Sequence, residues 1–112
     1  MLIEQIKNKM SNFIELFLTC ADRAEAEKIA DVLIGKHLVA AVNYVRVEGK
    51  TRWDGITEGD EVGMRMMSVA SNFDRIEEEV ANLHSYDTFV LQAISISHLN
   101  TEAAKWLTEN TR

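Results

Sequence analysis

The sequence predicts an α+β protein in which two amphipathic helices cover one face of an antiparallel sheet. Two observations indicate this class. Short apolar segments alternate with segments of helical periodicity, in the order strand, helix, two strands, helix, strand. Each helical segment has a single apolar stripe, so it can bury one side against a sheet while its other side faces water.

The first strand and the first helix follow each other closely. Residues 13–19 (FIELFLT) are apolar and partly β-branched or aromatic, as expected for a largely buried strand. Asp22 and Glu25 then have the spacing of a capping box. The apolar residues that follow recur at helical intervals: Ala26, Ile29, Ala30 and Leu33. We therefore expect a helix that begins after Asp22 and ends near Gly35.

A long hairpin is expected next. Residues 39–47 have the composition of a strand, Glu48-Gly49-Lys50 that of a turn, and residues 58–60 give a second turn signal. The return arm, residues 61–69, alternates two sets of side chains. One face is apolar (Val62, Met64 and Met66) and the other is mixed (Gly63, Arg65 and Met67).

A second amphipathic helix follows the hairpin. Ser71 is in position to cap it, with Asp74 in the first turn. Its apolar stripe consists of Phe73, Ile76, Val80 and Leu83. The polar turn His84-Ser85-Tyr86-Asp87 is expected to end this helix.

The remaining segments complete the domain. Residues 88–97 are expected to form the last strand, and residues 101–109 a short C-terminal helix with Trp106 and Leu107 on its inner side. Residues 1–12 are expected to be an N-terminal extension of a single domain spanning residues 13–112. Within that domain no proline, linker or repeat marks a boundary.

This element order, βαββαβ with a short C-terminal helix, is the split βαβ or ferredoxin-like arrangement. Right-handed crossovers place both main helices on one face of its antiparallel sheet. The other face stays open, and Tyr44, Val45, Met66 and Met67 cannot all point toward the helices. We therefore expect residual apolar surface that another copy of the chain covers.

Composition narrows the classes of partner. The 112 residues are 46% hydrophobic and 27% charged, which is typical of a globular protein. A net charge of −6 disfavours nucleic acid, which is bound through clustered Lys and Arg, and tolerates a cation. The single cysteine, Cys20, fits a reducing cytoplasm. No apolar run approaches the ~20 residues that span a bilayer, so no membrane partner is expected.

Several short segments, in order, carry a resemblance to a known family. They are Thr19-Cys20 with Asp22, residues 25–30 (EAEKIA), residues 38–43 (LVAAVN), Trp53-Asp54-Gly55, His84-Ser85-Tyr86 and Trp106-Leu107. Over residues 13–110 the chain resembles the CutA family, the divalent-cation-tolerance proteins. The resemblance implies a ferredoxin-like protomer in a homotrimer, joined through sheet edges and the long hairpin, with tolerance to ions such as copper.

The chain differs from the family pattern at four places. Ala41 stands where the family has Cys, Met67 where it has Lys, Ser85 where it has Pro, and Phe89-Val90 where it has Pro-Glu. Met67 and Val90 would make a cleft between subunits more apolar. This favours a second hypothesis, a regulatory trimer like the PII proteins that binds a small organic ligand in such clefts.

Four residues are candidates for a metal or ligand site. Cys20 precedes a helix N-terminus, where a thiolate is favoured, although it is also intelligible as a small buried hydrophobe. His84, Tyr86 and Asp87 form a polar turn that could supply nitrogen and oxygen ligands, or only hydrogen-bond within the protein. Met64, Met66 and Met67 could add soft ligands for Cu(I), but alternation divides them between two faces, so most are expected to be packing residues.

The remaining aromatic and apolar candidates point to subunit contacts. Trp53 lies in a polar hairpin and is expected to anchor an interface, as Trp often does. Tyr44, Met67 and Trp106 are expected to contact a neighbouring subunit as well. No catalytic residue is assigned, because neither Cys20 nor His84 has a recognisable base or oxyanion partner, and the protein is not expected to be an enzyme.

Overall fold

The computed structural model describes residues 12–112, which contain one four-stranded antiparallel sheet and three α-helices. In chain order the elements are β1 (Phe13–Cys20), α2 (Arg23–Gly35), β2 (Ala41–Arg52), β3 (Ile56–Val69), α3 (Phe73–Leu83), β4 (Leu91–Ser95) and α4 (Thr101–Asn110). The strands lie side by side in the order β2-β3-β1-β4. This is the predicted ferredoxin-like topology with an appended helix. The expected N-terminal extension, apart from Asn12, lies outside the described residues.

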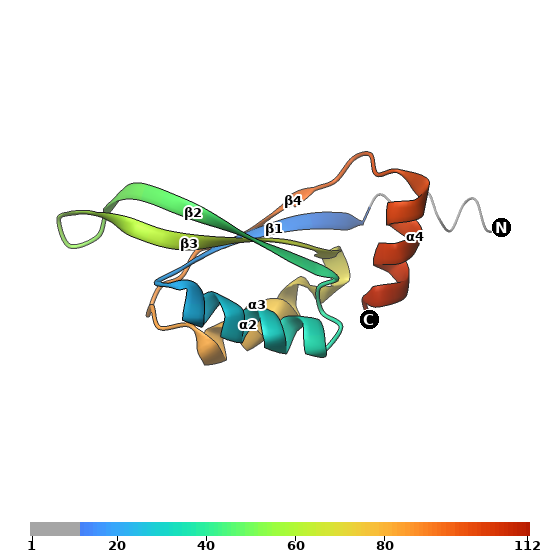
Figure 1. Cartoon of the computed structure of the whole chain (residues 1–112), viewed down its shortest axis with the longest axis horizontal. Coiled ribbons are helices and arrows are strands. Elements are labelled where there is room, and N and C mark those ends of the chain that lie inside the picture. Colours follow the sequence, from blue (N-terminus) through green and yellow to red (C-terminus); the bar gives the residue numbers. More distant parts are fainter. Residues whose placement is uncertain (1–11) are drawn as a thin grey trace.

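Helices α2 and α3 lie together on one face of the sheet (Figure 1). The main core lies between them and the strands, because alternate residues of β1 and β3 point toward the helices. It includes Leu16 and Leu18 of β1, Met64 and Met66 of β3, Ile29 and Leu33 of α2, and Ile76 and Val80 of α3. The predicted helical stripes and the apolar face of β3 are thus confirmed. None of the helices within residues 12–112 is long and apolar enough to cross a membrane.

The two main helices begin differently. The Asp22 carboxylate accepts the Glu25 N–H at 2.9 Å, as the capping-box spacing predicts. The predicted cap at Ser71 is wrong, since a 3₁₀ turn (Ala70–Asn72) leads directly into α3. The buried Asn72 amide instead donates to the Leu38 carbonyl oxygen at 3.1 Å, an acceptor that Ser68 also uses. Tertiary contacts therefore fix the start of α3.

Strands β2 and β3 form one long hairpin that projects beyond the helices (Figure 1). The predicted turn at Glu48-Gly49-Lys50 is wrong, because these residues continue β2 and pair with residues 58–60 of β3. The chain reverses at Trp53-Asp54-Gly55, where the Trp53 N–H donates to the Gly55 carbonyl at 2.8 Å. Asp54 and Gly55 have φ values of 47° and 101°, so left-handed residues make the turn.

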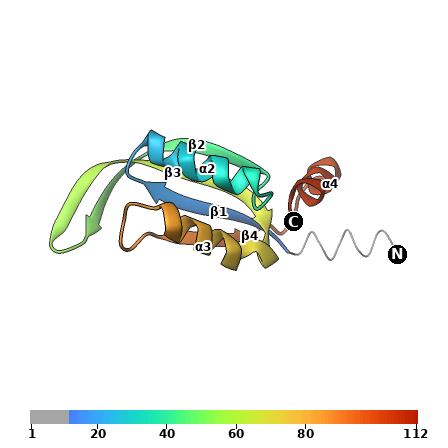
Figure 2. The ribbon, with the colours of Figure 1, turned by 90° about the horizontal axis from the view of Figure 1, so that it is seen from below.

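Helix α4 packs on the end of the sheet, away from the tip of the hairpin (Figure 2). Ala104 and Leu107, one helical turn apart, bury against Phe13 in a second small core. Trp106 is 39% exposed, so the prediction that it lies on the inner side is wrong. Strand β4 is also shorter than the predicted range of residues 88–97.

The sheet face opposite α2 and α3 carries a shallow depression of about 280 Å³. It is lined by Glu15, Phe17, Arg65, Gln92 and Ile94. Arg65 and Glu15 form an ion pair across it at 3.0 Å, and Ile94 is 59% exposed. This face is therefore the open one that the topology predicts.

Candidate metal centre

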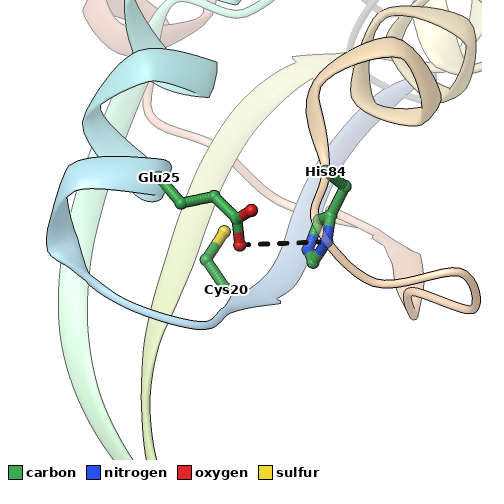
Figure 3. A group of neighbouring side chains, drawn as sticks. All are labelled: Cys20, Glu25 and His84. Carbon is green, nitrogen blue, oxygen red and sulfur yellow. Dashed lines mark ion pairs between the residues drawn. The ribbon is translucent and has the colours of Figure 1, made fainter.

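Three potential metal ligands meet where β1 leads into α2. Cys20 is the last residue of β1, Glu25 lies in the first turn of α2, and His84 directly follows α3. One ligand atom from each lies within 4.8 Å of the other two, and Figure 3 shows the three side chains converging. Strand and helix ends distant in sequence thus bring together one sulfur, one nitrogen and one oxygen donor.

Cys20 is a fully buried thiol that lies beside a second sulfur. Its S–H donates to Met64 Sδ at 3.6 Å. Burial, followed by the nearby carboxylates of Glu25, Glu61 and Asp22, raises the pKa of Cys20 from 9.0 to about 12. Without a metal the thiol therefore stays protonated at neutral pH. The same carboxylates favour a cation at this position, and a bound metal ion removes the proton from a coordinating thiol.

Glu25 joins the start of α2 to the turn after α3. One carboxylate oxygen accepts the Ala21 N–H at 3.0 Å and the other accepts the Ser85 N–H at 2.7 Å. Burial acts to raise the pKa of Glu25, but these hydrogen bonds and the nearby His84 outweigh it, and the pKa lies below 4.5. Glu25 is thus a carboxylate at neutral pH, with Oε1 3.9 Å from His84 Nδ1.

The His84 ring is held in one orientation and one tautomer. Its side chain is fully buried, and its Nε2 lies 2.8 Å from the Thr19 carbonyl oxygen. Because a carbonyl oxygen only accepts, Nε2 carries the hydrogen and Nδ1 carries the lone pair, which accepts the Tyr86 N–H at 3.1 Å. A histidine that donates one N–H to a backbone carbonyl and offers its other nitrogen is typical of metal-binding sites.

The other two predicted ligand residues lie outside this group of three donors. The Tyr86 hydroxyl donates to Glu61 Oε2 at 2.7 Å, and burial together with Glu61 raises the pKa of Tyr86. Its ring packs against His84 with 4.7 Å between ring centroids. Asp87 is exposed. Tyr86 therefore supports the imidazole of His84, whereas Glu25, expected only as a helix cap, lies among the donors.

The four predicted subunit contacts have different surroundings within the chain. Trp53 is 60% exposed at the hairpin turn, and Trp106 is partly exposed on α4. Tyr44 packs against the main core, and the Arg23 guanidinium lies 3.9 Å from its ring centroid. Met67 packs against the small core beneath α4. Trp53 and Trp106 are thus the more exposed of the four, and their contact with a neighbouring subunit stays a prediction.

The donor set fits a transition metal. Thiolate, imidazole and carboxylate are the ligands that zinc and copper take in proteins. Calcium and magnesium instead need several oxygen ligands, often including water, which a buried site with a cysteine does not supply. The site is therefore chemically suited to a soft or borderline ion.

Comparison with known proteins agrees with the fold. The profile of the family described as "CutA1 divalent ion tolerance protein" matches residues 14–110. The divalent-cation tolerance proteins CutA of Archaeoglobus fulgidus and Pyrococcus horikoshii are 34% and 29% identical, over 89% and 88% of this chain and 97% and 98% of theirs. The crystal structure of CutA1 from Oryza sativa superposes with a TM-score of 0.87 at 26% identity, covering 90% of this chain and 94% of that one.

These matches include all three described helices and nearly the whole sheet. Two relatives are matched over almost their full length, so the likeness is not confined to one motif. The chain therefore belongs to the CutA1 divalent ion tolerance protein family.

Proposed function

We propose that this protein is a non-enzymatic homotrimer that binds a divalent transition-metal ion, with copper the leading candidate. The observation that carries the proposal is the convergence of Cys20, Glu25 and His84 donor atoms within 4.8 Å. Membership of a family named for divalent-ion tolerance supports it. The function would be to hold the ion out of solution.

The proposed ligands are Cys20 Sγ, His84 Nδ1 and a carboxylate oxygen of Glu25. Binding displaces the thiol proton of Cys20, so each ion bound releases one proton to solvent. The ion also replaces the Tyr86 N–H at His84 Nδ1, while the bond from Nε2–H to the Thr19 carbonyl keeps the ring oriented. The two negative charges of Cys20 and Glu25 neutralise a divalent ion in this buried place.

The absence of catalysis is part of the proposal. A thiol whose pKa is raised to about 12 is a poor nucleophile at neutral pH, because the thiolate is the reactive form. The Nδ1 lone pair of His84 accepts a backbone N–H in the metal-free protein, so it is not directed at Cys20 as a general base would be. These contacts support a binding role over a reaction.

Isothermal titration with Zn²⁺ and Cu²⁺ tests the proposal. We expect one ion per chain with a Kd well below the millimolar range. Cys20→Ala and His84→Gln should each weaken binding about 10-fold or more. The matched control is His98→Gln, because His98 is an exposed histidine outside the donor group. A folded wild-type protein that binds neither ion more tightly than millimolar would refute the metal role and leave the family assignment intact.

A further inference from the structure

Met64 places a second sulfur beside the candidate metal centre. Met64 and Cys20 are both 0% exposed, and their sulfur atoms lie 3.6 Å apart. The strand register explains the contact. Met64 of β3 pairs with Leu18 of β1, and Cys20 lies two residues farther along β1 on the same face. The contact is therefore built into the sheet rather than into a loop.

We propose that Met64 is a ligand of this centre for soft monovalent ions only, so that the centre binds Cu(I) and Ag(I) as well as divalent ions. The inference rests on the proposed function, because Cys20 and His84 serve as ligands in both. Thioether and thiolate sulfur select Cu(I), and imidazole also binds copper. Cys20, Met64 and His84 would thus supply two sulfur atoms and one nitrogen to the ion.

Charge balance separates the two kinds of ion. A Cu(I) ion is neutralised by the Cys20 thiolate alone, so Glu25 can keep its hydrogen bonds to Ala21 and Ser85. A divalent ion bound to one thiolate leaves a positive charge, which is costly when buried unless the Glu25 carboxylate offsets it. Monovalent ions should therefore depend on Met64, and divalent ions on Glu25.

A pair of substitutions with one control tests this division. Met64→Leu keeps an apolar side chain of similar volume and removes the sulfur. We expect it to weaken Cu(I) binding about 10-fold or more and to leave Zn²⁺ binding unchanged. Glu25→Gln should instead weaken Zn²⁺ binding and leave Cu(I) binding unchanged. Met66→Leu is the control, since Met66 is equally buried on the same strand but pairs with Leu16.

The measurements use the full chain and are made under anaerobic conditions. Cu(I) affinity is measured by competition with a chromophoric Cu(I) chelator, Zn²⁺ affinity by calorimetry, and folding by circular dichroism. X-ray absorption of the Cu(I)-loaded wild type should show two sulfur neighbours at about 2.3 Å, a typical metal–sulfur distance. Met64→Leu should show one.

The possible results separate this inference from the proposed function. If wild type binds Zn²⁺ and Met64→Leu keeps its full Cu(I) affinity, Met64 is not a ligand and the divalent site stands. If wild type binds neither ion, both proposals fall. Should Met64→Leu not fold, the wild-type absorption spectrum decides, because a single sulfur neighbour would overturn the role of Met64.

Discussion

Burial decides the chemistry of Cys20, the only cysteine of the chain. The pKa of Cys20 is about 12, whereas that of a solvent-exposed thiol is 9.0. This difference corresponds to roughly 1000-fold less thiolate near pH 8 than an exposed cysteine would have. We predict that iodoacetamide modifies Cys20 of the metal-free native protein at least 100-fold more slowly than in urea. Mass spectrometry of timed samples measures both rates, and equal rates would show that the thiol is accessible and ionised in the fold.

Glu25 should make stability depend on pH in the acidic range. Its folded pKa lies below 4.5, so its contribution is fully present above pH 4.5 and is lost as the pH falls through the folded pKa. We predict that Glu25→Gln, in metal-free protein, reduces the loss of unfolding free energy between pH 7 and about pH 3. Urea unfolding at the two pH values measures it. An identical loss in the variant would contradict the role of its hydrogen bonds.

The sequence could predict only some of the residues of the candidate metal centre. Cys20 and His84 were identifiable because their residue types suit a metal. Glu25 gave only the local signal of a helix cap, and Met64 that of a core residue. Their contacts with Ser85 and Cys20 join distant segments, and no spacing in the sequence encodes them.

At the scale of elements, β3 depends on a glycine where the open face is crowded. A Cβ atom on Gly63 would lie 2.7 Å from the Phe17 ring and 2.8 Å from a Val45 methyl. We predict that Gly63→Ala lowers the free energy of unfolding by about 1–3 kcal/mol, because neighbouring side chains must move. Gly59→Ala, on the same strand with nothing within 4 Å, should change it little. Chemical denaturation of both variants decides, and equal stabilities would contradict the crowding.

Elements set by periodicity were predictable, and those set by pairing were not. The stripes of α2 and α3 are local patterns, so their positions followed from the sequence. Residues 48–50 have turn-forming composition, yet pairing with residues 58–60 holds them in β2. Likewise, the side of α4 that is buried depends on the position of Phe13, which the helix sequence does not reveal.

At the scale of the whole molecule, apolar surface remains uncovered in the isolated chain. Trp53 and Ile56 at the hairpin end are 60% and 65% exposed, and Ile94 lies on the open face. A two-stranded ribbon with so little burial is marginally stable alone. These observations support the proposed homotrimer, in which neighbouring copies would cover the hairpin and the open face.

In the PII-like alternative, a small organic ligand would lie in a cleft between subunits of the trimer. This alternative stays a prediction, as does a cytoplasmic location. A thermal-shift screen of metabolites on the assembled protein tests the alternative, since a ligand that binds only the folded state raises the melting temperature. A screen without any stabilising compound would count against it.

Native mass spectrometry of zinc-loaded protein tests most directly whether the chain is a metal-binding trimer. We expect a species of about 38 kDa, three times the 12.7 kDa chain, that carries three ions. Cys20→Ala should give the same trimer without the ions. A wild-type species of 12.7 kDa would show that the chain is not a trimer, and a trimer that takes up no metal would show that it has no metal site.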